Sequence, residues 1–288
     1  MTSTVLVTGG TGTVGSRLLP LLAATGRPVR ALVRHPDRPL PGGVRGVVGD
    51  FADPDSLDAA LAGVDAVFLA CGNGPDQVSY ESNLIDAAAR QRVGRIVKLS
   101  ARGAAPGAQV AFWVGHAEIE RRLAASGVPA VLLRPGFLMS NLLASDGSVR
   151  EHGLLFAPTG DARIAMIHPA DVAAVAARAL TEPGHDGRTY TLTGPEAVGF
   201  AQVAAALSHA LGRPVEFVDV SAEAARSGLI ESGLPPVAAD QVLAVFAALR
   251  AGAQATTTAT VPALLGRPAL GIADFVAEWC LEASGSRR

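Results

Sequence analysis

Four glycines near the N-terminus stand at the spacing of a phosphate-binding turn. The apolar run TVLV is followed by TGGTGTVG, so that Gly10, Gly12 and Gly15 form a G-x-G-x-x-G just before a helical pattern. The first glycine permits a tight turn, the second lets the backbone approach a diphosphate, and the third allows close helix packing. Gly9 adds an overlapping G-x-x-G-x-x-G with the same physics. The helix start then attracts phosphates through its N–H groups.

This turn is predicted to hold a dinucleotide. The residues that would form the cradle are Thr8, Gly9, Gly10, Thr11, Gly12, Thr13, Val14 and Gly15. A glycine-rich turn without a ligand is the alternative, but strand, turn and helix occur in the order that dinucleotide binding requires. A Walker-type triphosphate loop is excluded, because no Gly-Lys-Ser or Gly-Lys-Thr follows the turn.

The end of the second apolar run bears on the choice between NAD and NADP. An acidic residue there would bind the ribose 2′-hydroxyl of NAD, whereas a cation suits the 2′-phosphate of NADP. The sequence ALVRHPDR ends the run with Arg34 and places Arg38 close behind, which favours NADP. Asp37 argues the other way, since it could turn back to a ribose, and Arg34 could be a solvated surface cation.

Two later runs end in further candidates for this site. Asp50 and Phe51 end the third run and are expected to meet the adenine. The fourth run ends with the residues expected beside the ribose, which are Ala70, Cys71 and Gly72. Ligands of open parallel sheets bind outside the carboxyl ends of the strands, so these groups should lie together.

Short β-branched runs alternate with amphipathic helical stretches up to about residue 137, as in repeated βαβ units. Strands are predicted at 4–8, 28–34, 44–49, 65–71, 94–99 and 129–134, with helices at 13–25, 54–62, 76–92 and 111–126. The runs are nearly continuously apolar, which indicates helices on both sheet faces. The predicted fold class is therefore an α/β, doubly wound Rossmann sheet.

Beyond residue 138 this alternation stops. The polar stretch 144–153 is interpreted as a surface loop or pocket lid, followed by a helix near 169–181 and a strand at 188–193. Mostly helical material is expected up to residue 284. We predict a Rossmann domain of residues 1–137, completed by 168–193, and a smaller, mainly helical substrate lobe of 138–167 and 194–288.

Composition narrows the classes of partner and compartment. The 288 residues carry 24 Lys plus Arg against 26 Asp plus Glu, so no broad basic field favours nucleic acid or an anionic membrane. Cys71 and Cys280 do not suggest a disulfide framework, and a cytoplasmic setting is expected. No signal core and no apolar run of about 18 residues occur, so neither export nor membrane spanning is predicted.

Other chemistries find little support in the sequence. The histidines lack an i, i+4 pair and the cysteines stand far apart, so no metal site is expected. A G-x-S-x-G hydrolase elbow is also missing.

Six stretches carry a family pattern: VTGGTGTVG at 7–15, VR at 33–34, RIVKLSA at 95–101, HAEIERRLAASGVP at 116–129, LLRPGFLMSN at 132–141 and HPADVAAVAARAL at 168–180. In them the chain resembles the NmrA-like group of atypical short-chain dehydrogenases/reductases, in particular its quinone oxidoreductase-like and NAD(P)H azoreductase-like members. The resemblance implies an NADPH-bound Rossmann domain, with the active site in the cleft beside a small C-terminal lobe.

The resemblance also implies site residues. Ser100 would face the cofactor and His116 the nicotinamide ribose, which makes both candidate catalytic residues. The residues that would line the nicotinamide are Pro135, Gly136 and Phe137, and those that would border the substrate are Trp113, Phe137 and Asn141.

One departure from the related reductases affects the mechanism. Many short-chain reductases carry Tyr-x-x-x-Lys on this helix, whereas the chain has Phe112 and His116. A tyrosine-driven ketone reduction is therefore in doubt, although a histidine of ordinary pKa, about 6.5, could donate a proton near neutral pH. Alternatively, Phe112, His116, Ile119 and Leu123 form one helical stripe, so His116 could be a core residue, and Ser100 a strand-end cap.

Two functions remain open on the sequence alone. The first is an NADPH-dependent oxidoreductase that passes a hydride to a small conjugated acceptor, such as a quinone or an aromatic or polyketide carbonyl compound. The second is a redox-sensing regulator that binds NADP(H) without catalysis. No nucleic-acid or membrane partner is expected, and a homodimer is left open.

Overall fold

The computed structural model describes residues 3–285, which divide into two compact units. The first comprises the described residues up to Ala108 together with Phe112–Pro135 and Pro169–Thr191. The second comprises Gln109–Ala111, Gly136–His168 and the described residues from Leu192 onward. Within the described range, no helix is both long enough and apolar enough to cross a bilayer.

A seven-stranded sheet forms the centre of the first unit. Its strands are β1 (Val5–Val7), β2 (Val29–Val33), β3 (Val44–Val48), β4 (Ala66–Leu69), β5 (Arg95–Leu99), β6 (Ala130–Pro135) and β8 (Thr189–Leu192). They lie in the order β3-β2-β1-β4-β5-β6-β8, and β1 to β6 pair in parallel. The predicted strands and the Rossmann fold class are confirmed. The strand order reverses between β1 and β4, where this fold binds its ligands.

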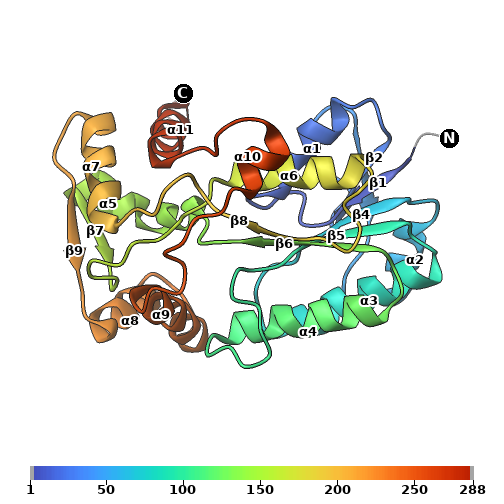
Figure 1. Cartoon of the computed structure of the whole chain (residues 1–288), viewed down its shortest axis with the longest axis horizontal. Helices are drawn as coiled ribbons and strands as arrows, with labels where there is room; N and C mark the ends of the chain where they lie inside the picture. Colours follow the sequence, from blue (N-terminus) through green and yellow to red (C-terminus); the bar gives the residue numbers. More distant parts are fainter. Residues whose placement is uncertain (1–2, 286–288) are drawn as a thin grey trace. The chain divides into compact units, whose positions relative to one another are not determined.

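Helices cover both faces of this sheet. They are α1 (Gly15–Ala23), α2 (Pro54–Leu61), α3 (Gln77–Arg90), α4 (Ala111–Ala125) and α6 (Pro169–Thr181). Figure 1 shows α1 and α6 over one face and α2, α3 and α4 over the other. This coverage explains why the strands read as continuous apolar runs rather than as an alternation.

One hydrophobic core joins the layer formed by α2, α3 and α4 to the sheet. Leu6, Val67 and Ile96 from three strands pack with leucines and isoleucines of the layer, namely Leu57, Leu61, Leu84, Ile85, Ile119 and Leu123. Each fully buried side chain of this size contributes about 1.5–3 kcal/mol to folding. This core therefore holds α2, α3 and α4 firmly against the sheet.

The second unit has its own core and a small sheet. Its elements are the 3₁₀ helix η1 (Met139–Ser145), α5 (Asp146–His152), β7 (Leu154–Ala157), α7 (Phe200–Leu211), β9 (Glu216–Asp219), α8 (Ala222–Glu231), α9 (Pro236–Arg250), α10 (Thr260–Leu265) and α11 (Ile272–Gly285). β7 pairs in parallel with β9. Phe137, Phe200 and Phe246 meet in its core, with ring centroids 6.3–6.4 Å apart.

One expectation for this unit is corrected, and two strands were not predicted. The stretch 144–153 is not a loop, because η1 and α5 occupy it up to Gly153, whose φ of +70° ends the helix. An ion pair between Asp146 and Arg150 and the buried Val149 stabilise that helix despite its polar composition. The strands β7 and β9 were not foreseen, since each is four residues long and its partner lies far away in the chain.

Candidate functional site

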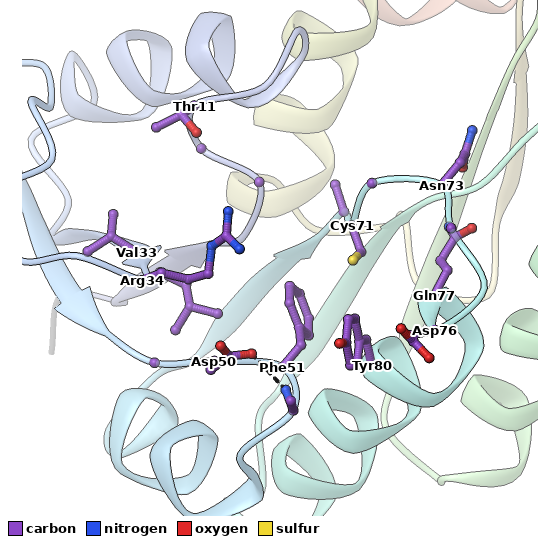
Figure 2. Close-up of a pocket in the computed structure, with 18 of the residues that line it drawn as sticks. Thr11, Val33, Arg34, Asp50, Phe51, Cys71, Asn73, Asp76, Gln77 and Tyr80 are labelled. Atoms are coloured by element: carbon purple, nitrogen blue, oxygen red, sulfur yellow. Dashed lines mark hydrogen bonds between the residues drawn. The ribbon is translucent and has the colours of Figure 1, made fainter. Parts of the chain in front are cut away.

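A cavity of about 570 Å³ opens at the carboxyl ends of β1, β2, β3 and β4. It spans the point where the strand order reverses, and its wall continues onto the first turn of α3 with Gln77 and Tyr80. Its size is that of a small-molecule or cofactor pocket. Figure 2 shows the labelled side chains of Thr11, Arg34, Phe51 and Cys71 around it.

The glycine turn forms one wall, and two of its glycines are required by the backbone. Gly9 has a φ of +60°, a left-handed conformation that favours glycine. A Cβ at Gly15 would stand 2.1 Å from the carbonyl oxygen of Gly9, so any side chain there would push α1 away from the turn. Gly12 N donates to the Gly9 carbonyl at 2.9 Å, which closes the turn. The G-x-x-G-x-x-G pattern of Gly9, Gly12 and Gly15 therefore describes this turn better than the G-x-G-x-x-G pattern that begins at Gly10.

Thr8 links the start of the turn to the end of β4 through its side-chain hydroxyl. Its Oγ1 accepts a hydrogen bond from Ala70 N at 2.8 Å. The same oxygen lies 2.9 Å and 3.0 Å from the carbonyl oxygens of Ala70 and Phe68, one of which receives its single proton. Thr8 is fully buried, so it positions the ends of β1 and β4 rather than reaching into the cavity.

Two arginines and a histidine follow β2 on the cavity wall. Arg34, His35 and Arg38 line the space, whereas Asp37 is not part of its lining. Arg34 is exposed, and its guanidinium has no hydrogen-bond or ion-pair partner in the described part of the chain. Figure 2 shows this group between the turn that carries Thr11 and the ring of Phe51. An arginine with all its donors free suits a phosphate.

The segment after β3 forms the opposite wall. The rings of Phe51 and Tyr80 stack with centroids 6.3 Å apart and an interplanar angle of 16°. Asn83 Nδ2 donates to the Phe51 carbonyl at 2.9 Å, which fixes the wall to α3. These contacts present a flat aromatic surface to the cavity.

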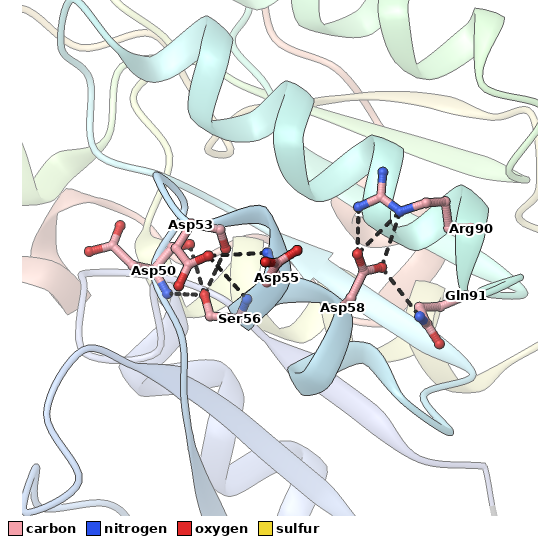
Figure 3. Close-up of polar contacts among 7 residues, drawn as sticks. All are labelled: Asp50, Asp53, Asp55, Ser56, Asp58, Arg90 and Gln91. Carbon is pink, nitrogen blue, oxygen red and sulfur yellow. Dashed lines mark hydrogen bonds and ion pairs between the residues drawn. The ribbon is translucent and has the colours of Figure 1, made fainter.

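A capped helix start holds this wall in place, as Figure 3 shows. Asp53 caps α2 by accepting hydrogen bonds from the backbone N–H groups of Asp55 and Ser56. Ser56 Oγ accepts a hydrogen bond from Asp50 N at 3.0 Å. Further along α2, Asp58 forms an exposed ion pair with Arg90 at 2.7 Å, which lowers the pKa of Asp58 through that hydrogen bond.

The cavity wall gathers many of the predicted cofactor residues, namely Gly9, Gly10, Thr11, Arg34, Arg38, Asp50, Phe51, Ala70, Cys71 and Gly72. It also includes residues that the sequence reasoning missed, which are Leu32, Val33, His35, Gly49, Ala52, Asn73, Gly74, Pro75, Asp76, Gln77 and Tyr80. The cluster Asn73-Gly74-Pro75 is a turn signal directly after a strand, and that signal could have found the loop. Gly12, Thr13, Val14 and Gly15 shape the turn behind the wall.

The other predicted residues lie outside this wall. Pro135 ends β6 and is buried, and Trp113 packs against Gly103, where a Cβ would stand 2.7 Å from its ring. Gly136, Phe137 and Asn141 belong to the second unit, in which Phe137 N donates to Gln254 Oε1 at 2.7 Å. The roles assigned to these residues at the nicotinamide and substrate stay predictions.

His116 is part of a buried polar cluster that we call the lysine network, defined as Gln77, Glu81, Lys98 and His116. Lys98 and Glu81 are 0% exposed, and the ammonium Nζ lies 2.7 Å from Glu81 Oε2 and 3.0 Å from Oε1. Gln77 Nε2 donates to the same Oε1 at 3.1 Å. His116 Nδ1 lies 3.4 Å from Nζ. Burial raises the pKa of Glu81, and Lys98 opposes that rise.

This environment changes what His116 can do. Burial, and then the charge of Lys98, lower the pKa of His116 to about 2. The imidazole is therefore neutral at neutral pH, and the expectation of an ordinary acid with a pKa near 6.5 is wrong. A neutral imidazole can still donate one N–H hydrogen bond.

Ser100 lies in a second buried cluster beside it. Its hydroxyl donates to Glu120 Oε1 at 2.6 Å, and Arg134 Nε donates to the same oxygen at 2.9 Å. Arg134 Nη2 also pairs with Glu120 Oε2. Since the only proton of Ser100 is engaged by Glu120, its oxygen can offer lone pairs but no donor. No group of three or more His, Cys, Asp or Glu side chains among the described residues is arranged to hold a metal.

Comparison with known proteins places this geometry in a family. The family model described as NAD(P)H-binding matches residues 9–183, which is more than half of the chain. The chain belongs to the NAD(P)H-binding family.

Several similar proteins align with nearly the whole chain. NAD(P)H azoreductase of Xenophilus azovorans is 40% identical over 94% of this chain and 96% of its own length. A (4-alkanoyl-5-oxo-2,5-dihydrofuran-3-yl)methyl phosphate reductase of Streptomyces griseus is 42% identical over 95% and 97%. The crystal structure of the Escherichia coli quinone oxidoreductase QOR2 with NADPH superposes with a TM-score of 0.85 at 30% identity, covering 96% of this chain and 99% of that one.

These findings confirm the resemblance stated from the sequence motifs. The chain is an NAD(P)H-dependent oxidoreductase with a site for NADP(H). The glycine turn agrees with that cofactor, because Gly9 adopts a left-handed backbone conformation and Gly15 leaves no room for a Cβ between the turn and α1.

Proposed function

We propose that the chain transfers a hydride from NADPH to a conjugated acceptor such as a quinone or an aromatic or polyketide carbonyl compound. The observation that carries the preference for NADPH is Arg34. Its guanidinium lines the cavity after β2 with no partner in the described part of the chain, and Arg38 lines the same cavity. Asp37, the residue that would favour NAD, does not line the cavity.

The rest of the cavity supports the same cofactor. Backbone N–H groups of the turn between Gly9 and Gly15, at the start of α1, suit a diphosphate. The flat face made by Phe51 and Tyr80 suits an adenine ring. Arg34 and Arg38 would then meet a phosphate on the adenosine ribose, so that each wall has one part of the nucleotide to hold.

The site lacks a phenolic acid, which favours a conjugated acceptor. At the positions of the usual Tyr-x-x-x-Lys the chain has Phe112 and the neutral His116, so no phenol is available there as an acid. A quinone spreads the charge of an added hydride over its conjugated ring and needs less help from an acid than a simple ketone. Two relatives are named azoreductase and quinone oxidoreductase, and azo compounds and quinones share this conjugation.

The chain's own groups have limited tasks in this reaction. Bound NADPH supplies the hydride, and the acceptor takes up one proton for each hydride it receives. His116 is proposed to donate a hydrogen bond from its neutral ring to the negative charge that develops nearby. Ser100 is proposed to accept a hydrogen bond from cofactor or substrate, because its own proton is engaged by Glu120. The final proton then comes from water.

A turnover assay tests this proposal. Purified protein is mixed with NADPH and, in parallel, with a naphthoquinone, an azo dye and an unconjugated aliphatic ketone. We expect loss of the reduced-nicotinamide absorbance with the first two and little loss with the ketone. Tight NADPH binding without oxidation by any acceptor would contradict the proposal and support the non-catalytic sensor instead.

A further inference from the structure

The lysine network places the ammonium group of Lys98 in the apolar layer between the sheet and the helices α3 and α4. Lys98 lies on β5 directly after the buried Ile96 and Val97. Its neighbours Glu81 and His116 come from α3 and α4. An unpaired charge in such a place would be strongly destabilising, so the network needs a reason for its retention. Hydrophobic residues of similar size would fill the space at no such cost.

The donors of Lys98 determine where the proton of His116 resides. An ammonium has three N–H donors and no acceptor. Its three neighbours are the Glu81 carboxylate, the Leu99 carbonyl oxygen and His116 Nδ1. Because a donor faces Nδ1, that nitrogen must be the unprotonated acceptor. The ring proton is then on Nε2, and no described residue forms a hydrogen bond with Nε2.

We propose that the buried Glu81–Lys98 pair is a positioning device, which holds His116 as a neutral imidazole with its single proton on Nε2 and so reserves that N–H for a ligand. Glu81 and Lys98 act through His116 and are positioning residues rather than catalytic ones. The assignment of the ligand to the reaction site rests on the proposed reductase function.

The network also reaches the cofactor cavity. Gln77 lines that cavity and is 4% exposed, and its Nε2 donates to the carboxylate that pairs with Lys98. One continuous set of contacts therefore runs from the cavity wall through Glu81 and Lys98 to His116. His116 keeps 6% exposure, whereas the ion pair keeps none.

Other charged groups around His116 do not replace this effect. Glu120 lies one turn further along α4, and Arg134 and Ser100 engage it. Cys71 follows β4, and burial together with the charge of Glu81 raises its pKa, so it is an uncharged thiol near neutral pH. Lys98 is thus the charge that acts on the ring, in the same direction as burial.

Nitrogen NMR of the histidines measures the proposed state directly. The signals of His116 are assigned by their loss in His116→Gln. In the wild-type protein we expect a neutral ring with the proton on Nε2 throughout pH 5–8. In Lys98→Met the repelling charge and the donor to Nδ1 are lost, so we expect the ring to titrate in this range or to populate both tautomers.

Turnover provides the second measurement. We expect kcat of Lys98→Met to fall by at least about tenfold while NADPH affinity is unchanged, because one oriented donor can contribute about a hundredfold or more. Glu81→Gln keeps the side-chain shape but removes the charge that offsets the buried ammonium, so the ring state and kcat should change in the same direction. A matched control is Arg122→Met, which removes an exposed ion pair with Asp86 that also links α4 to α3. It should leave both readouts unchanged.

The outcomes separate this inference from the proposed reaction. A folded Lys98→Met with the wild-type ring state and wild-type kcat would overturn the inference. If that variant does not fold, Glu81→Gln decides in the same way. If the wild-type protein oxidises no NADPH with any acceptor, the reductase proposal fails, yet the ring state in the variants still decides whether the pair positions His116.

Discussion

Two cations of the first unit differ in what surrounds them. Arg34 follows β2, is exposed at the cavity wall and has no partner in the described part of the chain. Lys98 lies on β5, is fully buried and directs all its donors at protein acceptors. A cation with free donors can bind a ligand itself, whereas one whose donors are engaged can act only through the groups it touches. The two should therefore respond differently to substitution.

The largest expected difference is in stability. Lys98→Met leaves Glu81 buried without its ion-pair partner and should lower the free energy of unfolding by about 3–5 kcal/mol. Arg34→Met removes no contact with a described residue and should leave the free energy of unfolding unchanged. Urea unfolding of both variants provides the measurement. Equal stability of the two variants would break the comparison.

The next effect is on cofactor affinity. Arg34→Ala should weaken NADPH binding by about 1.5–3 kcal/mol, the usual size of a lost hydrogen bond to a charged group, and leave NADH binding nearly unchanged. Calorimetric titration of the variant with each nucleotide measures both values. An equal loss for NADH and NADPH would mean that Arg34 does not contact the additional phosphate.

A smaller effect should appear as a pH dependence of stability. The pKa of His116 is about 2 in the folded chain and near 6.5 when unfolded. Between these values the unfolded state binds a proton that the folded state does not, so stability falls as the pH falls below 6.5. From pH 6.5 to 5.5 the wild-type protein should lose about 1 kcal/mol more than His116→Gln. Urea unfolding at the two pH values measures this difference, and parallel curves would contradict the low pKa.

The smallest effect is expected at the exposed pair of α2 and α3. Asp58→Asn breaks the ion pair with Arg90, which solvent screens on both sides. Because neither residue touches the cavity, NADPH affinity and turnover should equal those of the wild-type protein. A changed nucleotide affinity in this variant would show that the loss of the ion pair shifts the cavity wall formed by Asp50 and Phe51.

The sequence predicted the first unit well because its signals are local. Each strand is a compact apolar run, and the glycine turn carries its own conformational requirement at Gly9 and Gly15. Rules about strand ends then placed Arg34 and Phe51 at the same cavity without knowledge of any contact. The match of the predicted and observed strands follows from the helices on both faces, which force nearly continuous apolar runs.

The parts that were missed depend on contacts between distant segments. In the sequence, Lys98 stands out only as part of an apolar strand, although a lysine in an apolar run indicates that a buried partner exists. Its partner Glu81 could not be predicted, since neither local sequence determines how α3 packs against β5. The same holds for β7 and β9, which pair across a separation of more than fifty residues. The pKa of His116 followed from those contacts and was therefore wrong in the sequence reasoning.

Calorimetric titration of the wild-type protein with NADPH and with NADH tests the central claim most directly. The cradle after β1 and the free Arg34 after β2 predict heat of binding with both nucleotides and a clearly lower Kd for NADPH. Absence of binding heat with either nucleotide at millimolar concentrations would contradict the site itself. Tighter binding of NADH would contradict the role assigned to Arg34.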